Sequence, residues 1–277
     1  MPNAEDHSAG PNPEGDASAM FHVTPSSCDK FLSGRIRLWQ PARGYRAGVD
    51  PVFLAAACPA RPGDTVLELG CGVGAASLCL GARVAGLHLT GVERHAPTAA
   101  LARRNAQENR RADTPEMDVI EADLADLPAP LRARSFDHVI ANPPYFDRSR
   151  GSRAEGAARE AAMGEDTPLA TWLECAARRL RPRGWLTLIH HPTRLPDILS
   201  ALPDRLGSVE ILPLAPRTGR EASLVLIRAR KGGGAAPRLH FPVILHEGAQ
   251  HLADGEDYSR QISAVLRDAA PMPGLAP

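Results

Sequence analysis

The sequence predicts an α/β fold in which a seven-stranded, mainly parallel sheet carries helices on both faces. Short apolar runs alternate with helical patterns from residue 65 onward, as expected for successive βαβ units. A glycine-rich turn at residues 70–74 follows the first apolar run and opens a helix. The last two runs are joined only by residues 215–222, which are too few for a helical crossover. The last strand is therefore expected to be antiparallel to its neighbour.

The expected elements follow one another along the chain. Strands are predicted at residues 65–69, 87–93, 118–122, 136–141, 185–190, 209–214 and 223–230. Helices are predicted at residues 75–85, 96–109, 167–180 and 193–206. Pro168 favours the start of the third helix, because proline is tolerated at the first helical position. A loop rich in Gly, Ala and Arg is expected between the fourth strand and this helix.

The regions outside this alternation have a different composition. Residues 1–28 are rich in Pro, Gly, Ala, Asn and Ser without apolar periodicity, which predicts a disordered tail. Residues 29–234 form the expected main domain, with 29–60 as its N-terminal flank. Residues 235–268 are interpreted as a small C-terminal extension, and residues 269–277 as a loose tail.

Composition limits the classes of protein to which the chain can belong. The formal net charge is zero, so no overall field draws the molecule to nucleic acid or membrane. Five scattered cysteines without metal-ligand spacing predict reduced thiols and no metal. No apolar run approaches the length of a membrane span, and no signal peptide is recognisable. We expect a cytoplasmic monomer or weak dimer without a membrane partner.

The first strand–turn–helix unit has the features of a nucleotide-type cofactor site. Gly70, Gly72 and Gly74 let backbone pass close to a ligand at the positive end of a helix. Glu68 lies near the end of the first strand. Glu93 ends the second, where a carboxylate can accept bonds from ribose hydroxyls. The same glycines also fit the dinucleotide fingerprint, so a nicotinamide or flavin enzyme stays open at this point.

A second candidate cofactor contact follows the third strand. Asp123 can accept a hydrogen bond from the exocyclic amine of a cofactor, or it can be a solvated loop acid or helix cap. Its spacing favours neither alternative.

The motif Asn142-Pro143-Pro144-Tyr145 follows the fourth strand, at the edge where open α/β sheets bind ligands. An amine conjugated to a ring or carbonyl is a poor nucleophile. The Asn142 side-chain carbonyl and the Pro143 backbone carbonyl can accept its two N–H bonds, and Pro144 restricts Pro143 to extended geometry. Tyr145 can stack on the planar target. The motif therefore predicts methylation of an amino group.

These two sites together resemble the class I methyltransferases, which have a Rossmann-like fold and modify amino groups. The segments at residues 34–50 and 212–232 are similar to those of the tRNA1(Val) adenine-37 N6-methyltransferase family, and the resemblance covers residues 31–267. It implies S-adenosylmethionine as cofactor, tRNA as partner and adenine N6 as target. It places Glu68, Gly70, Gly72, Glu93 and Asp123 on the cofactor, with residues 46–50, including Asp50, near its methionine end. Val49 departs from the Thr or Ser of many relatives, which puts one hydroxyl contact in doubt.

We expect arginines around the opening of the pocket to bind the RNA. The substrate-binding candidates are Arg46, Arg148, Arg150 and Arg217, with Arg35, Arg37, Arg43, Arg153 and Arg220 as further ones. Arg178, Arg179, Arg181 and Arg183 are explained by the negative end of their helix.

Four other side chains receive ordinary structural interpretations. Trp172 and Trp185 are expected in the core, and the pair at residues 190–191 is expected to face solvent at a strand end.

Two alternatives stay open. A protein glutamine N5-methyltransferase shares the Asn-Pro-Pro-Tyr motif, although only about 40 ordered-looking residues precede Thr65, where that group typically carries a helical domain. A catalytically silent RNA-binding scaffold with this fold is the alternative from another class.

Overall fold

The structure is a computed structural model that describes residues 26–110, 117–147, 164–165, 167–248 and 257–276. Its strands are β1 (Ser26–Phe31), β2 (Ile36–Pro41), β3 (Thr65–Leu69), β4 (His88–Glu93), β5 (Met117–Glu121), β6 (Phe136–Ala141), β7 (Phe146–Asp147), β8 (Gly164–Glu165), β9 (Leu180–His190), β10 (Leu206–Ala215), β11 (Leu224–Lys231), β12 (Arg238–Leu239) and β13 (Val243–Ile244). Its helices are α1 (Asp50–Ala57), α2 (Ala75–Arg83), α3 (Ala96–Glu108), α4 (Ala129–Arg132), α6 (Leu169–Arg179), α7 (Leu195–Ala201) and α8 (Arg260–Asp268), with short 3-10 turns η1 (Leu32–Gly34) and η3 (Pro192–Arg194).

The central sheet has the predicted architecture. Within the described residues its order is β12-β10-β11-β9-β6-β3-β4-β5, and β13 also pairs with β10. β3, β4, β5, β6 and β9 pair in parallel, whereas β11 is antiparallel to both β9 and β10. The mainly parallel sheet with an antiparallel last strand is thus confirmed. The C-terminal extension adds the two short strands β12 and β13 in parallel to β10.

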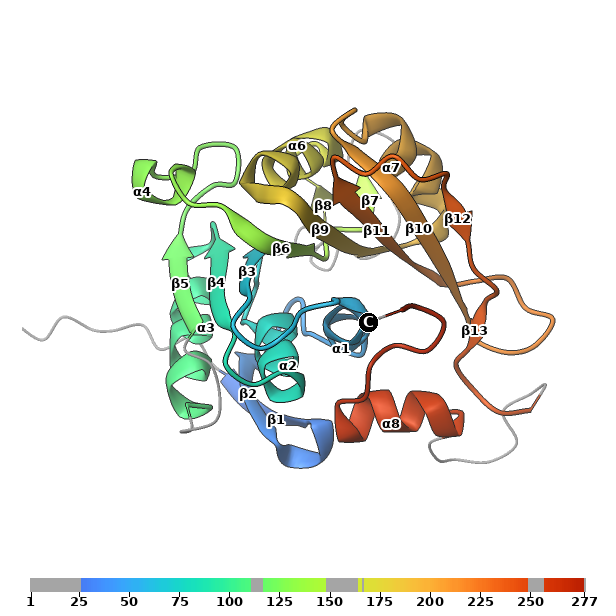
Figure 1. Ribbon diagram of the computed structural model, residues 1–277. Coiled ribbons are helices and arrows are strands. Elements are labelled where there is room, and N and C mark those ends of the chain that lie inside the picture. The colour runs from blue at the N-terminus through green and yellow to red at the C-terminus, as the bar shows by residue number, and fades with distance from the viewer. Residues whose placement is uncertain (1–25, 111–116, 148–163, 166, 249–256, 277) are drawn as a thin grey trace, which may run out of the picture.

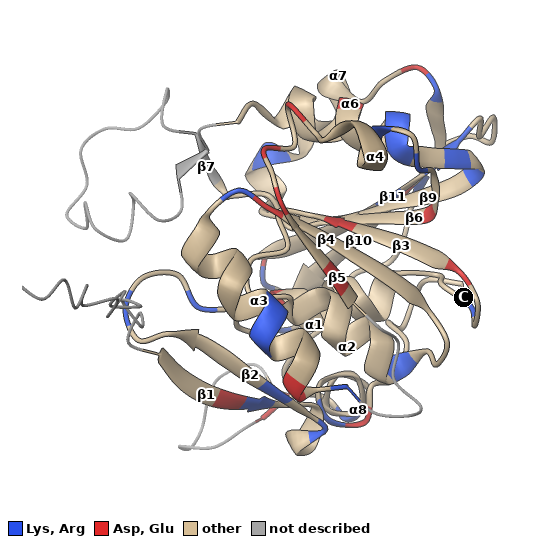
Figure 2. Ribbon diagram, turned by 90° about the vertical axis from the view of Figure 1, so that its left-hand side faces the viewer, with Lys and Arg blue, Asp and Glu red and all other residues tan. Residues whose placement is uncertain are grey.

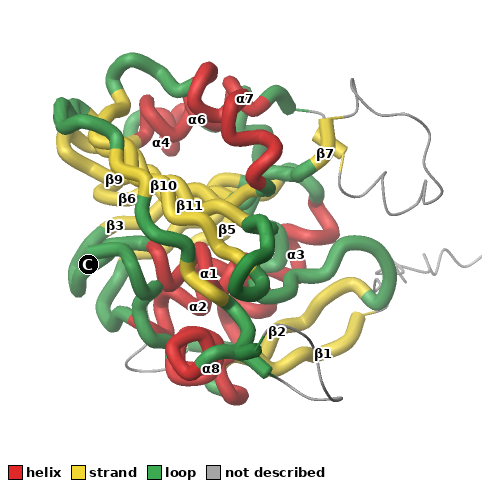
Figure 3. Tube along the Cα trace, turned by 90° about the vertical axis from the view of Figure 1, so that its right-hand side faces the viewer, coloured by secondary structure: helices red, strands yellow, loops and turns green. Residues whose placement is uncertain are grey.

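Helices cover both faces of this sheet (Figures 1 and 3). α1, α2, α3 and α8 pack on one face around a core that includes Phe53, Leu54 and Leu80. α4, α6 and α7 pack on the other face around Phe136 and Leu173. Burial on both faces explains why the parallel strands are continuous apolar runs in the sequence.

The hairpin β1–β2 is attached to α3 by two asparagine side chains. Asn105 accepts from the backbone N of Trp39 at 2.7 Å and donates to its carbonyl at 3.0 Å. Asn109 makes the same pair of bonds with Arg37, at 2.9 and 2.7 Å. Asn105 also donates to the carbonyl of Val73 at 2.9 Å, which connects the hairpin to the glycine-rich turn.

Both predicted tails differ from the structure where it describes them. Residues 26–28 belong to β1 rather than to a disordered tail, and residues 1–25 lie outside the described residues. The C-terminal segment is packed rather than loose, because Met272 is 2% exposed and its backbone N donates to Ala56 at 2.9 Å. Arg228 donates to the carbonyl of Ala276 at 2.6 Å. The segment was predicted to be loose because of its Pro and Gly content, but the buried side chains of residues 272 and 275 attach it to the core.

Candidate active site

A cavity of about 750 Å³ opens at the carboxyl ends of β3, β4, β5 and β6. These ends meet at one sheet edge because the strands are parallel, so the turns that follow them converge. The cavity brings together the predicted residues Asp50, Glu68, Gly70, Gly72, Glu93, Asp123, Asn142, Pro143, Pro144 and Tyr145.

The glycine-rich turn forms the floor of the cavity. Gly70 has φ +60°, and a Cβ there would lie 2.4 Å from the ring of Trp172, so only glycine fits. Gly74 was also predicted to contact the cofactor, but it is outside the cavity lining. It takes the left-handed cap position before α2, and a Cβ there would meet Met117 at 3.3 Å.

Glu68 stabilises the helix that follows this turn. Its carboxylate is buried and accepts bonds from the backbone N and hydroxyl of Ser77, at 2.9 and 2.5 Å. Burial raises the pKa of Glu68 to about 7, against the lowering effect of the Ser77 bonds. Glu68 therefore contributes first to the shape of the turn, since Ser77 occupies one carboxylate oxygen.

The two further acids hold the loops beside the turn. One oxygen of Glu93 accepts from the backbone N of Gly72 at 3.0 Å, and the other accepts from that of His95 at 2.8 Å. Asp123 accepts from the backbone N of Ala125 at 2.8 Å. Each carboxylate oxygen has a second lone pair, so both groups can still accept bonds from hydroxyls or amines of a ligand.

Asn142 presents an unsatisfied acceptor at the wall of the cavity. Its side-chain oxygen is buried and has no hydrogen-bond partner within the described chain. A buried polar atom without a partner costs about 1–3 kcal/mol, and such atoms are few in folded proteins. A ligand that carries an N–H group would satisfy it.

Tyr145 is fixed by two contacts. Its hydroxyl donates to Asp50 at 2.6 Å, and its ring centroid lies 5.0 Å from that of His190. Burial raises the pKa of Asp50, and the hydrogen bond from Tyr145 opposes this rise. The tether to α1 holds the aromatic ring at the end of the motif, where it forms part of the cavity wall.

His190 is buried, which corrects the expectation that both histidines at this strand end face solvent. Its Nδ1 accepts from the backbone N of His191 at 2.8 Å. Burial, together with the nearby Arg194, lowers the pKa of His190 to about 4. His190 is thus a neutral ring that supports Tyr145, whereas His191 is exposed as expected.

Two aromatic residues of the cavity were not predicted as site residues. Trp172, expected only in the core, also lines the cavity, and its buried Nε1 has no acceptor among the described residues. Tyr45 also lines the cavity and keeps 46% of its surface exposed. Its hydroxyl is surrounded, and this burial, with the Asp50 and Glu68 carboxylates, raises the pKa of Tyr45 to about 12. The family-like segment at residues 44–50 was the available signal for Tyr45.

Most of the predicted RNA-binding arginines have other partners or lie outside the described residues, whereas Arg43 lines the cavity. Arg46 forms an ion pair with Asp29 and donates to the carbonyl of Pro41 at 2.7 Å, so it holds the hairpin. Arg217 forms an ion pair with Asp257. Neither lines the cavity. Arg148, Arg150 and Arg153 lie outside the described residues.

Comparison with known proteins identifies the family. The family model described as "Methyltransferase small domain" matches residues 49–212, more than half of the chain. The chain belongs to this family. A tRNA1(Val) (adenine(37)-N6)-methyltransferase of Dickeya chrysanthemi is 29% identical over 232 residues, which cover 80% of this chain and 87% of the relative. A protein of the same name from Actinobacillus succinogenes is 34% identical over 164 residues, covering 57% and 66% of the two chains.

A solved structure supports the same assignment. The crystal structure of a predicted O-methyltransferase from Agrobacterium tumefaciens superposes with a TM-score of 0.65 at 27% identity, covering 80% of this chain and 98% of that one. The class I, Rossmann-like methyltransferase fold is confirmed, and so is the resemblance stated from the sequence. The protein is a methyltransferase with S-adenosylmethionine as its cofactor.

The polar groups that line the cavity fit this cofactor. Carboxylates at Glu93 and Asp123 match ribose hydroxyls and an adenine amine, and the glycine turn leaves room for close approach. Among the described residues, no group of His, Cys, Asp and Glu is placed to bind a metal ion. In the same part of the chain, no helix combines the length and apolar character needed to cross a bilayer.

Proposed function

We propose that this methyltransferase acts on the exocyclic N6 amine of an adenine in tRNA. The observation that carries the proposal is the buried side-chain oxygen of Asn142, which has no partner within the described residues and lies at the cavity wall. The adenine amine offers N–H donors on a planar ring, which complement this acceptor. The relatives named for adenine 37 of tRNA1(Val) favour this target over other amino groups.

The residues of the motif perform complementary tasks in the proposed reaction. The amine is a weak nucleophile because its lone pair is delocalised into the ring. The side-chain oxygen of Asn142 and the backbone oxygen of Pro143 accept hydrogen bonds from the two N–H groups of the amine. These bonds orient the nitrogen lone pair toward the methyl group of the cofactor. Pro144 fixes the geometry of Pro143. Tyr145, held by Asp50, stacks on the base and replaces the stacking that is lost when the base leaves its loop.

The cofactor contacts occupy the other half of the cavity in this proposal. S-adenosylmethionine supplies an electrophilic methyl group when it is bound. Glu93 would accept hydrogen bonds from the ribose hydroxyls of the cofactor, and Asp123 would accept one from its adenine amine. The turn at Gly70 and Gly72 lets the backbone approach the ligand closely, with Asp50 near the methionine end.

The proposed partner is a structured tRNA in the cytoplasm. Arg148 and Arg150 stay candidates for contacts to its phosphates, because they follow the target motif in the sequence. If they bind phosphate, charge reversal at both raises the KM for tRNA without weakening cofactor binding, and activity falls steeply with salt.

The decisive test is incubation of the full chain with radiolabelled S-adenosylmethionine and either total tRNA or total protein, followed by nucleoside and amino-acid analysis. We expect N6-methyladenosine in the tRNA. Label in glutamine of a protein, with tRNA unlabelled, would assign the chain to the glutamine N5-methyltransferases. Binding of tRNA without transfer to either pool would favour the silent scaffold.

A further inference from the structure

A group of cationic side chains lies at the sheet edge opposite the cavity. It is formed by the end of α6, the beginning of β9, the residue before β10 and the end of β11. We define the basic edge as Arg178, Arg179, Arg181, Arg183, Arg205, Arg230 and Lys231. Figure 2 shows Lys and Arg concentrated around this end of the sheet. The side chains of Arg178, Arg181 and Arg205 are 67%, 48% and 40% exposed, so a large ligand can reach them.

Acidic side chains compensate only part of this charge. Glu174 forms ion pairs with Arg178 and Arg205. Asp137 holds Arg181, with N–O distances of 2.8 and 2.9 Å. Two carboxylates therefore face three of the seven cations.

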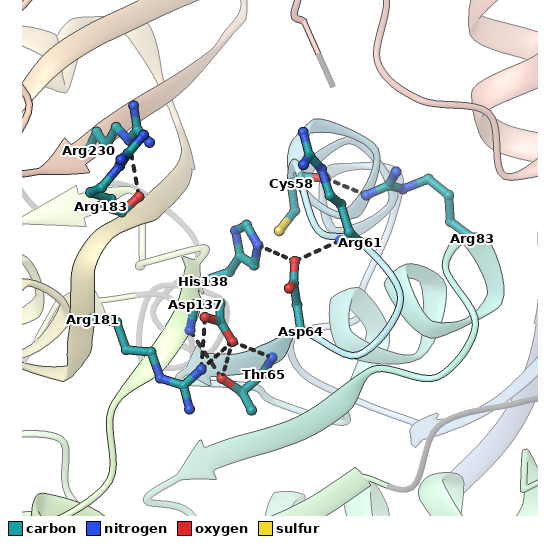
Figure 4. A network of polar contacts seen from close by, with 10 residues as sticks. All are labelled: Cys58, Arg61, Asp64, Thr65, Arg83, Asp137, His138, Arg181, Arg183 and Arg230. Carbon is teal, nitrogen blue, oxygen red and sulfur yellow. Dashed lines mark hydrogen bonds and ion pairs between the residues drawn. The ribbon is translucent and has the colours of Figure 1, made fainter.

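Three of the four remaining cations have neutral partners. Arg230 donates to the backbone oxygen of Arg183 at 3.1 Å (Figure 4). Its guanidinium also lies over the ring of Trp185, at 5.5 Å from the ring centroid. Lys231 donates to the carbonyl of Leu180 at 2.6 Å. Arg179 donates to the carbonyls of residues 131, 132 and 134. Carbonyls and rings orient these groups without cancelling their charge.

The cations also destabilise one another. Burial lowers the pKa of Lys231, and the charges of Arg205 and Arg179 lower it further. The dipole of α6 favours cations only in its last turn, which accounts for Arg178 and Arg179. It does not account for Arg205 or for the cations of β9 and β11, although the sequence alone had suggested the dipole for Arg181 and Arg183 as well.

The helix α6 connects this surface with the cavity. Thr167 and Trp172, at its beginning, line the cavity, and Arg178 and Arg179 lie at its other end. Its 11 residues span about 16 Å. A polyanion with one unit in the cavity can therefore extend along α6 and reach the basic edge.

We infer that the basic edge binds the phosphate backbone of the RNA stem adjoining the methylated loop. The inference rests on the proposed function, because only a target base in the cavity places the stem along α6. Regular duplex RNA is held mainly by shape and phosphate contacts, which suits a row of arginines without a base-reading pocket. Arg230 over Trp185 adds a fixed guanidinium plane to this row.

The test compares two hairpin RNAs that share a loop with one unpaired adenosine and differ in stem length. The variant carries Arg178→Gln, Arg183→Gln and Arg205→Gln. A matched control removes three exposed arginines elsewhere, with Arg110→Gln, Arg260→Gln and Arg267→Gln. For the long hairpin, we expect the variant to raise the KM about tenfold and to reduce the salt dependence of binding by about two to three phosphate contacts. For the short hairpin, and for the control variant, we expect little change.

Direct RNA binding, measured by fluorescence anisotropy, and cofactor binding, measured by calorimetry, separate the possible failures. Unchanged affinity of the variant for the long hairpin would overturn the basic edge while leaving adenine methylation intact. Equal losses of affinity for both hairpins would also overturn it, as would an equal loss in the control variant. Either result would show an effect of the overall charge of the protein rather than of this surface. Wild-type chain that binds the hairpins without methylating them would refute the proposed function, and a stem-dependent loss in the variant would still support the edge. Preferential binding of anionic vesicles through these arginines would assign the edge to a membrane surface and contradict the inference.

Discussion

The two edges of the central sheet use polar groups in opposite ways. At the carboxyl edge, Asn142 keeps a buried acceptor without a partner in the described chain. At the amino edge, Asp137 accepts from the backbone N and hydroxyl of Thr65, at 2.9 and 2.7 Å, and also binds Arg181 (Figure 4). The unpaired Asn142 oxygen marks a place where a ligand can complete the structure, whereas the Asp137 carboxylate is used within the protein.

Two buried histidines on neighbouring strands show the same difference. His190 is next to the site motif, and its surroundings favour the neutral ring. His138 lies at the other edge, where its Nε2 is 3.0 Å from a carboxylate oxygen of Asp64. Burial alone would lower the pKa of His138, but contacts with Cys58 and Asp64 outweigh it and raise the pKa. One histidine supports an aromatic wall, and the other has an acid beside it that favours the protonated ring.

The largest expected effect is on catalysis at the carboxyl edge. Asn142→Ala should reduce the methyl-transfer rate at least about a hundredfold, because the lost contact is strongest in the transition state. Cofactor affinity should stay nearly unchanged, as measured by calorimetry. An active Asn142→Ala enzyme would show that the unpaired oxygen at the carboxyl edge has no role in catalysis.

The two histidines should give stability opposite dependences on pH. The folded pKa of His190 is about 4, below its ordinary value, so its contribution is complete above about pH 6.5 and is lost as the pH falls toward 4. The full loss is on the order of 3–4 kcal/mol. For His138 the folded pKa is raised, so its contribution is complete below about pH 6.5 and is lost as the pH rises through the raised value. Urea unfolding of His190→Gln and His138→Gln across this pH range measures both; the same sign in the two variants would contradict the prediction.

The amino edge should matter for stability rather than for binding. Asp137→Ala should lower the free energy of unfolding by about 2–3 kcal/mol, since it removes the acceptor for Thr65 and leaves Arg181 unpaired. Burial alone would raise the pKa of Asp137, but these bonds lower it. The contribution is therefore present above the ordinary pKa and is lost as the pH falls through the lowered one. Asp126→Ala, at a side chain that is 91% exposed, is the control, and cofactor affinity should not change in either variant.

A smaller effect is expected for the proposed ribose contact. Glu93→Ala should weaken binding of S-adenosylmethionine by about 1–2 kcal/mol, because charge-assisted hydrogen bonds are lost. Calorimetry measures the change, with Glu121→Ala at the neighbouring strand end as control. Wild-type affinity in Glu93→Ala would show that this carboxylate only holds the turn through Gly72 and His95.

The smallest effect concerns an arginine that was predicted to bind RNA. Arg46→Gln should cost less than about 1 kcal/mol of stability, because its ion pair with Asp29 is partly exposed, at 33% and 39%. The KM for tRNA should stay unchanged, since the Arg46 guanidinium is engaged by Asp29, Ser27 and the carbonyl of Pro41. A clear rise in KM would restore the original interpretation.

The sequence predicted those parts of the molecule that depend on local pattern. β3 and β6 have the predicted bounds, because buried parallel strands are apolar runs that end in recognisable turns. The motif at residues 142–145 was recognisable because its chemistry is contiguous in the chain. The partners of Arg46 and Arg217 were not predictable from the sequence. Asp29 and Asp257 lie far from these arginines in the chain, and only folding brings each pair together.

Burial at the ends of elements was also beyond the sequence pattern. His190 and Met272 are placed by packing between distant segments, which leaves no periodic signal. Gly74 satisfied the glycine pattern for a conformational reason, the left-handed cap before α2, and the pattern alone does not separate this role from ligand contact.

The asparagines of α3 have a consequence for self-association. An open strand edge is a template on which another chain can add a strand, and such edges promote aggregation. Asn105 and Asn109 occupy the backbone donors and acceptors of Trp39 and Arg37, so this side of β2 offers no such template. Two amide side chains thus replace a neighbouring strand, and the hairpin is guarded against amyloid-like pairing along that side without an additional element of structure.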